Sequence, residues 1–157
     1  NIEYLRGNYD EAKRLYEENL DIFKDLGDRS GIAKSLHQMA MIEQDKGNYD
    51  EAKRLYEDSL KIDTDLGDRS GIAMTMGALG ILFEKREQFE NALKYFLNTA
   101  YLFHQIGSPH EKQALREIAR TAQKLGEERS NRTMEEMPDE IKAYLRQTTT
   151  KPPNPAP

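Results

Sequence analysis

The sequence predicts an all-α fold, specifically an α-solenoid in which antiparallel helix pairs stack into a superhelix. The first observation is an internal repeat: residues 7–33 recur as residues 47–73, and the two copies differ at only five of 27 positions. The second is the spacing of apolar residues, which recur every three or four positions in both halves of the repeat, as in amphipathic helices. Units of this kind bury their apolar faces only against neighbouring units, so they stack.

The pattern predicts six helices in the repeat region and a short one after it. Their expected ranges are about 8–25, 30–46, 48–65, 70–86, 88–105, 109–128 and 137–145. Glycine closes helices in the left-handed conformation without a Cβ clash, and five glycines mark the expected ends. They are Gly7, Gly27, Gly47, Gly67 and Gly107.

The expected helix starts carry capping residues. Asn8 with Glu11 and Asn48 with Glu51 have the spacing of a capping box, in which each side chain bonds the backbone of the other. Pro109 follows Ser108 and is predicted to occupy the first helical position of its helix.

Residues 47–52, with the sequence GNYDEA, resemble the start of a helix in the tetratricopeptide repeat. Tyr56 and the small Ala40 and Gly80 of the preceding helices extend this resemblance, which covers residues 1–126. The family's usual period is about 34 residues, whereas the period here is about 40 residues. The longer period resembles the longer-helix subclass of the kinesin light chain type, which is also abundant in bacterial and archaeal multi-repeat proteins. Near-identical neighbouring copies favour a prokaryotic array.

Three segments are expected along the chain. Residues 1–128 form the repeats: a partial first repeat, two full repeats and one terminal helix. Residues 129–147 form a linker and a short C-terminal helix, which either caps the stack or docks in a groove. Residues 148–157 are rich in proline and are expected to be disordered. Because residues 1–6 align with 41–46, the first helix is expected to end at Gly7.

Composition excludes several classes of function. The 23 basic and 28 acidic residues give a net charge of −5, which disfavours nucleic acid as a partner. No apolar stretch reaches the roughly 20 residues of a membrane helix, so no membrane partner is expected. The absence of cysteine excludes disulfides and thiolate metal sites and fits a cytoplasmic protein.

The sequence shows no site for catalysis, for a metal or for a cofactor. The histidines, His37, His104 and His110, lie on different expected helices and lack paired-ligand spacing. The segment Asp63 to Asp68 departs from a calcium loop, since Met74 stands where the bidentate glutamate belongs. No nucleophile, base and orienting acid can be assembled. A non-enzymatic protein without cofactors is expected.

The resemblance implies a groove lined by the first helix of each pair, which would bind a protein or peptide. The residues that the helical phase places on this face are Lys34, His37, Gln38, Met41, Gln44, Asp45, Met74, Gly77, Ala78, Ile81, Glu84, Lys85, Ala114, Glu117, Thr121 and Lys124. An apolar strip with polar flanks suits an amphipathic helix or an extended apolar peptide.

Two other functions remain open at the level of sequence. One is a self-assembly module that forms homo-oligomers through the N-terminal end, where Ile2, Leu5 and Leu15 are expected to be exposed, or through the C-terminal helix. The other is the peptide-sensing regulatory region of a larger signalling protein.

Overall fold

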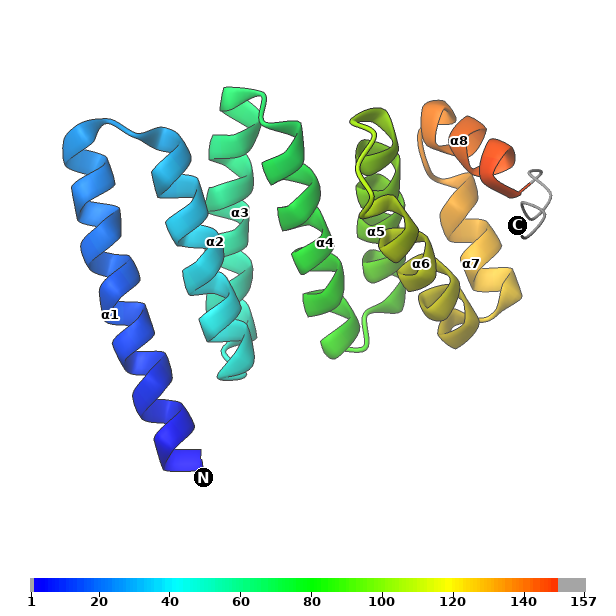
Figure 1. Cartoon of the computed structure of the whole chain (residues 1–157). Coiled ribbons are helices and arrows are strands. Elements are labelled where there is room, and N and C mark those ends of the chain that lie inside the picture. The colour runs from blue at the N-terminus through cyan, green and yellow to red at the C-terminus, as the bar shows by residue number, and fades with distance from the viewer. Residues whose placement is uncertain (1, 150–157) are drawn as a thin grey trace, which may run out of the picture.

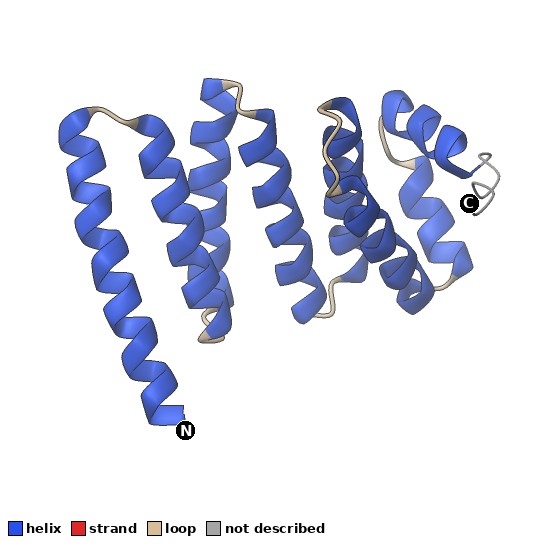
Figure 2. Cartoon of the chain, in the orientation of Figure 1, coloured by secondary structure: helices blue, strands red, loops and turns tan. Residues whose placement is uncertain are grey.

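The computed structural model describes residues 2–149, which form a single file of antiparallel helices (Figure 1). Short loops join the helices, and no residue between 2 and 149 belongs to a strand (Figure 2). The helices are α1 (Ile2–Leu26), α2 (Arg29–Asp45), α3 (Tyr49–Leu66), α4 (Arg69–Lys85), α5 (Phe89–Gln105), α6 (Glu111–Leu125), α7 (Glu127–Glu135) and α8 (Asp139–Thr149). The predicted all-α solenoid is confirmed.

Equivalent residues of successive repeats make equivalent contacts. Lys46 Nζ lies 3.0 Å from Asp10 Oδ1, and one repeat later Arg86 Nη1 lies 2.9 Å from Asp50 Oδ1. Lys46 directly follows α2 and contacts α1, and Arg86 directly follows α4 and contacts α3. The repeat seen in the sequence is therefore also a repeat of geometry.

Small residues allow the helices to cross closely. Ala40 and Ala52 are fully buried beside Tyr56, as the repeat pattern predicts. At Gly80 a Cβ atom would lie 2.6 Å from the ring of Phe96, so any larger residue would displace α5 or its aromatic side chain. These contacts form two apolar clusters, one around α2 and α3 and one around α5 and the C-terminal helices.

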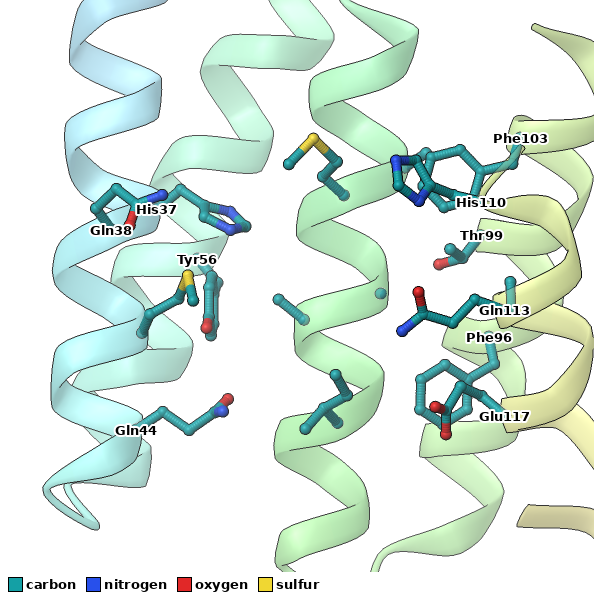
Figure 3. A pocket seen from close by; sticks show the side chains of 17 residues that line it. His37, Gln38, Gln44, Tyr56, Phe96, Thr99, Phe103, His110, Gln113 and Glu117 are labelled. Atoms are coloured by element: carbon teal, nitrogen blue, oxygen red, sulfur yellow. The ribbon is translucent and has the colours of Figure 1, made fainter. Parts of the chain in front are cut away.

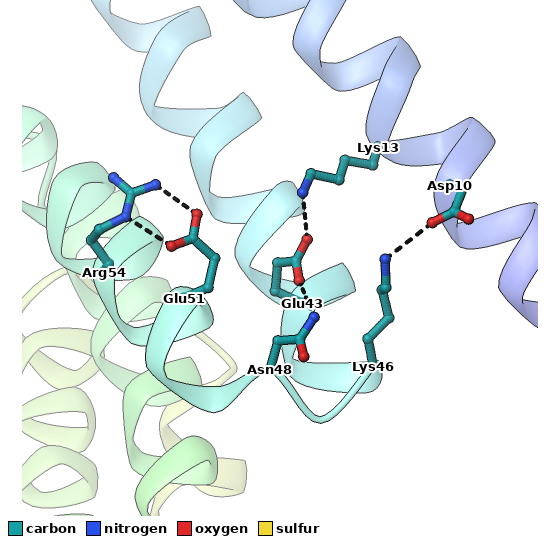
Figure 4. A network of polar contacts seen from close by, with 7 residues as sticks. All are labelled: Asp10, Lys13, Glu43, Lys46, Asn48, Glu51 and Arg54. Carbon is teal, nitrogen blue, oxygen red and sulfur yellow. Dashed lines mark hydrogen bonds and ion pairs between the residues drawn. The ribbon is translucent and has the colours of Figure 1, made fainter.

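The helix caps differ from those expected. The side chains of Asp28 and Asp68 accept hydrogen bonds from the backbone N–H of Gly31 and Gly71, and so cap α2 and α4. The capping box predicted at Asn48 and Glu51 does not form. Other partners take both side chains: Asn48 Nδ2 donates to Glu43 Oε2 at 2.7 Å, and Glu51 pairs with the Arg54 guanidinium at 2.7 Å (Figure 4).

A buried carboxylate organises the contact between α1, α2 and α3. Glu43 is buried and accepts from Lys13 Nζ of α1 at 2.7 Å as well as from Asn48 (Figure 4). Burial opposes ionisation of Glu43, but the hydrogen bonds from Lys13 and Asn48 outweigh it and hold its pKa below the usual range. Asn48 is thus fixed by the preceding helix instead of by its own.

The predicted helix end at Gly7 is wrong, because α1 runs without interruption from Ile2 to Leu26. The capping box expected at Asn8 and Glu11 is therefore also absent, and Glu11 pairs with Arg14 instead. Glycine inside a helix costs only about 1 kcal/mol relative to alanine, so helix propagation continues unless packing stabilises a turn. At Gly47 the packing of α2 on α3 supplies that stabilisation, whereas the few described residues before Gly7 are too short a segment to form an antiparallel partner helix.

Two boundaries near the C-terminus also differ from expectation. Helix α6 ends at Leu125 instead of continuing to 128, and the expected linker is the helix α7, on which Ser130 and Thr133 are buried. Gly126, at φ 88°, makes the sharp turn between them. Pro109 precedes α6 instead of opening it, since α6 begins at Glu111.

Helix α8 packs on the end of the stack. Ile141 and Tyr144 are buried in the same cluster as Phe103 and Ile118, and Tyr144 Oη donates to Glu111 Oε1 at 2.8 Å. This resolves the alternative left open by the sequence: α8 contacts the last repeat and not the groove. The proline-rich residues 150–157 lie outside the described residues, as do the side chains of Ile2 and Leu5.

Candidate functional site

A groove of about 490 Å³ runs across the helices α2, α4 and α6 (Figure 3). These three helices supply its walls and rim, while residues of α3 and α5, together with the buried Ala73 of α4, form its floor. Helices α2 and α3 form one pair, and α4 and α5 form the next. Since both pairs and α6 contribute to the lining, the groove crosses from one repeat to the next. A ligand there would contact several repeats at once.

An apolar strip lies along the rim and centre of the groove. Its members are Met41, Met74, Ala78 and Ile81, and the three large side chains are exposed, from 37% at Ile81 to 54% at Met74. They therefore do not serve the core of their own repeats. Burying such side chains fully is worth about 1.5–3 kcal/mol each, so a covering partner would gain substantially.

The floor of the groove contains an unpaired hydroxyl. Tyr56 is fully buried as a residue and lines the groove, yet its Oη has no hydrogen-bond partner among the described residues. Burial, with a smaller contribution from Asp45, raises the pKa of the Tyr56 hydroxyl, so it remains protonated and able to donate. The rings of His37 and Tyr56 pack edge to face, and their centroids lie 5.3 Å apart (Figure 3).

A second unpaired atom faces the same space from α2. Gln44 Oε1 is buried and accepts no hydrogen bond from residues 2–149. A buried polar atom without a partner costs about 1–3 kcal/mol, and a ligand that supplies the partner recovers this free energy. Tyr56 thus offers the groove an unpaired donor, and Gln44 offers an unpaired acceptor.

Most of the residues predicted for the groove line it together. They are His37, Gln38, Met41, Gln44, Met74, Gly77, Ala78, Ile81, Ala114 and Glu117. Lys34 lines a neighbouring pocket instead. The remaining residues, Asp45, Glu84, Lys85, Thr121 and Lys124, are not part of the lining.

The outlying residues have structural reasons for their positions. Glu84 joins α4 to α6, because its carboxylate accepts from Arg120 at 2.6 Å and from Lys124 at 2.9 Å. Burial opposes ionisation of Glu84, but these two cations keep its pKa below the usual range. Thr121 is fully buried, since α6 is packed between α5 and α7.

The sequence missed seven lining residues. Five belong to the floor, and two, His110 and Gln113, lie at the start of α6. The floor residues are Tyr56, Ala73, Phe96, Thr99 and Phe103. Helical phase assigns the floor residues to the core. A buried residue can pack in the core on one side and still border the groove on the other, and periodicity does not distinguish it from a residue that lies wholly inside the core.

Neither a metal centre nor a membrane helix is found in the described part of the chain. Within residues 2–149, no three His, Asp or Glu side chains gather closely enough to hold a metal ion. None of the eight helices there has the apolar length that crossing a bilayer requires.

A file of antiparallel helix pairs with a groove across one helix of each pair defines a helical-repeat solenoid, a fold that generally serves as a non-catalytic scaffold for protein–protein interaction. The chain belongs to the tetratricopeptide repeat family. The family model, described as tetratricopeptide repeat, matches residues 1–65 and again 31–98.

A solved structure supports the same fold. The chain is similar to the crystal structure of BtubC (BKLC) from P. vanneervenii, with a TM-score of 0.70 at 17% sequence identity. The match covers 96% of this chain and 62% of BtubC, so the chain spans less than two thirds of that protein. No curated protein sequence matches this chain significantly.

Proposed function

We propose that this chain is a scaffold whose groove binds an extended apolar segment of a partner protein. The observation that carries the proposal is the combination, in one groove, of the exposed apolar strip with the unpaired Tyr56 hydroxyl and Gln44 carbonyl. The apolar strip provides affinity for apolar side chains, and the two polar atoms provide a donor and an acceptor.

The polar atoms favour an extended peptide over an amphipathic helix. The backbone N–H and C=O groups of a helix are already paired within it, whereas those of an extended segment are free to bond a receptor. Tyr56 Oη would donate to a backbone carbonyl of the segment, and Gln44 Oε1 would accept from a backbone N–H. The walls of α2, α4 and α6 would enclose the segment on several repeats.

The test is selection of peptides from a random displayed library on the purified chain. The selected peptides should be apolar and should bind with an affinity that falls at least tenfold in Ala78→Arg, which places a charged side chain on the strip. Ala143→Arg, a matched change at an exposed position of α8, should leave binding unchanged. Equal loss in both variants, or in neither, would contradict groove binding.

Tyr56→Phe tests the hydrogen bond alone. Because Tyr56 Oη has no partner in the free protein, its removal should not lower the free energy of unfolding. Peptide affinity should fall about fivefold to tenfold, the value of one hydrogen bond of about 1–1.5 kcal/mol. Unchanged affinity would mean that the hydroxyl does not contact the peptide.

Self-assembly is a second candidate, favoured by one face of α1. Leu15 of α1 is 47% exposed, whereas its repeat equivalent on α3, Leu55, is 3% exposed because α2 packs there. Ile22 and Leu26 extend the open surface. The C-terminal helix, the other surface considered for assembly, buries its apolar residues within the chain itself.

A further inference from the structure

A second pocket adjoins the groove at the amino end of α4. Its volume is about 480 Å³, and it shares His37, Gln38 and Met74 with the groove, so one ligand can reach both. In contrast to the apolar groove, it is lined by Asp63 and Asp68 together with several hydroxyl side chains, and we refer to it as the acidic pocket.

Asp63 of the acidic pocket replaces an aromatic residue of the other repeats. Phe23 and Phe103 stand at the equivalent positions, one repeat before and one repeat after it. A Cβ atom on Gly31 would lie 2.5 Å from the Phe23 ring, and one on Gly71 would lie 2.7 Å from Asp63 Cγ, so both side chains rest on the same place of the next helix. The Asp63 carboxylate thus occupies the position that a phenylalanine ring fills in the other repeats. Because it is smaller than that ring, part of the volume that the ring would fill remains open as the acidic pocket.

Asp63 is a buried residue whose carboxylate lines the acidic pocket and has no partner among the described residues. The residue is 6% exposed, and no residue between 2 and 149 forms a hydrogen bond or ion pair with its side chain. Burial, reinforced by the nearby Asp68, raises the pKa of Asp63 to about 6, although Lys34 opposes the shift. At neutral pH the carboxylate is therefore ionised in a poorly solvated position, where a cation would stabilise it.

The surrounding groups accept hydrogen bonds more readily than they donate them. Ser59 Oγ already donates to the Ala33 carbonyl, and His37 Nδ1 lies 3.0 Å from Thr75 Oγ1. Asp68 accepts one backbone N–H through Oδ1 and keeps its second oxygen. Apart from Lys34, the pocket therefore offers mainly acceptors, and a ligand that brings donors suits it.

The charges around Asp63 also favour a cation. Two carboxylates, Asp63 and Asp68, face one ammonium, that of Lys34, which forms no ion pair with either of them. Burial lowers the pKa of His37, so it is neutral at pH 7. The amino end of α4 adds about half a positive charge, which is not enough to reverse the sign.

We infer that the acidic pocket takes the cationic side chain of an arginine or lysine in the same extended segment whose apolar side chains lie in the groove. This specificity rests on the proposed function, since it names a residue of the groove ligand. The cation pairs with the Asp63 carboxylate, and the apolar stem of the same side chain lies against Met74, which lines both spaces. The pocket thereby selects apolar segments that carry a basic residue at one end.

Two small probes separate the cation from the apolar stem. Hexylguanidinium carries both, and hexylurea is its neutral counterpart of nearly the same shape. Titration of each into isotopically labelled protein at pH 7.5 and 0.15 M salt, followed by NMR, reports where each binds. Hexylguanidinium should shift the amides of Ser59 and Gly71 as well as the methyl group of Met74, with a Kd at least fivefold lower than that of hexylurea.

Variants assign this preference to Asp63. Asp63→Asn keeps the shape and removes the charge, so the two probes should bind it equally. Asp25→Asn, a matched change at an exposed carboxylate of α1, should preserve the preference and so exclude a general effect of the net charge. Lys34→Met should strengthen hexylguanidinium binding because it removes a competing positive charge, and weaker binding would overturn the proposal.

The affinity should also depend on pH through Asp63. Between pH 7.5 and pH 5, the affinity of the parent for hexylguanidinium should fall about tenfold as Asp63 is protonated, given its pKa of about 6. Asp68, Lys34 and His37 also face the pocket, and any contribution of these groups persists in Asp63→Asn and can be subtracted.

The outcomes separate this proposal from the proposed function. Equal binding of both probes to the parent, with shifts confined to the groove, overturns the acidic pocket and leaves the groove as a peptide site. Absence of shifts from either probe overturns both proposals. A preference for hexylguanidinium that survives in Asp63→Asn places the cation elsewhere and also overturns the assignment.

Discussion

A single position of the repeat shows how one residue changes local chemistry without changing the fold. The positions of Phe23, Asp63 and Phe103 are equivalent, and each lies in the last two turns of its helix. The aromatic residues fill space, whereas Asp63 places a buried charge beside an open pocket. Such an exchange lowers stability in return for a chemical group, which is characteristic of binding sites.

The cost of Asp63 should be visible in the pH dependence of stability. Because its pKa is raised to about 6 from an unfolded value near 3.8, its unfavourable contribution grows as pH rises from about 4 to about 6. Relative to Asp63→Asn, the parent should gain about 1 kcal/mol of unfolding free energy between pH 7.5 and pH 5. Urea titrations at both pH values measure this difference. Parallel curves for parent and variant would show that Asp63 is not strained.

At the scale of the element, one sequence forms two local structures. Residues 7–16 and 47–56 are identical, yet the first copy lies inside α1 and the second contains the turn between α2 and α3. In the third copy the equivalent of Gly47 is Glu87, which adopts the same left-handed conformation at φ 58°. Tertiary packing therefore imposes this turn even on a residue that disfavours it.

Glu87→Gly should consequently stabilise the protein. Glycine adopts a positive φ without the Cβ clash that costs other residues about 1–2 kcal/mol, and part of this gain is offset by its greater freedom in the unfolded chain. The net gain expected is about 0.5–1 kcal/mol. Glu87→Ala removes the same carboxylate but keeps Cβ, so chemical denaturation should show no gain for it. Equal effects of the two changes would exclude backbone strain as the cause.

Helix α8 should protect the last repeat. Ile141→Ala removes a side chain buried in the same apolar cluster as residues of α5 and α6, and it should cost about 3 kcal/mol. Amide exchange should become faster in residues 111–125 and stay unchanged in residues 37–44, which line the far side of the groove. Ala143→Ser, on the exposed side of α8, serves as the control. Faster exchange in residues 37–44 alone would contradict a capping role.

At the scale of the whole molecule, the two ends of the described stack differ. Helices α7 and α8 cover the last repeat, whereas no helix among residues 2–149 covers the outer face of α1 (Figure 1). Each repeat of a solenoid contacts only the repeats next to it. A terminal helix without such a neighbour therefore leaves exposed the face on which another helix would pack. The open face of α1 is apolar at Leu15, Ile22 and Leu26.

This chain should therefore associate weakly through α1. Burial of three side chains yields several kcal/mol, which association costs largely offset, so a Kd of about 100 μM is expected. Light scattering across a concentration series should show dimers that disappear in the double variant Leu15→Lys and Ile22→Lys. Leu66→Lys, at another exposed leucine, should leave association unchanged. A parent that stays monomeric at millimolar concentration would contradict the prediction.

The helical solenoid, the repeat period and the packing of Ala40, Ala52 and Tyr56 could all be predicted from the sequence, because they follow from periodicity and from the recurrence of small and aromatic residues. Most of the groove rim could be located in the same way, since helical phase assigns exposed faces. The helix through Gly7, the helix α7 and the floor of the groove depend instead on tertiary packing. Local preferences of about 1 kcal/mol at a glycine or a polar segment do not decide the outcome. Packing between helices stabilises the turn at Gly47 and the helix α7, whereas without such packing the helix continues through Gly7, and no single segment encodes these contacts. The same holds for Tyr56 and Asp63. Their residue types are visible in the sequence, but only the assembled stack leaves the Tyr56 hydroxyl buried and unpaired and places the Asp63 side chain in a pocket.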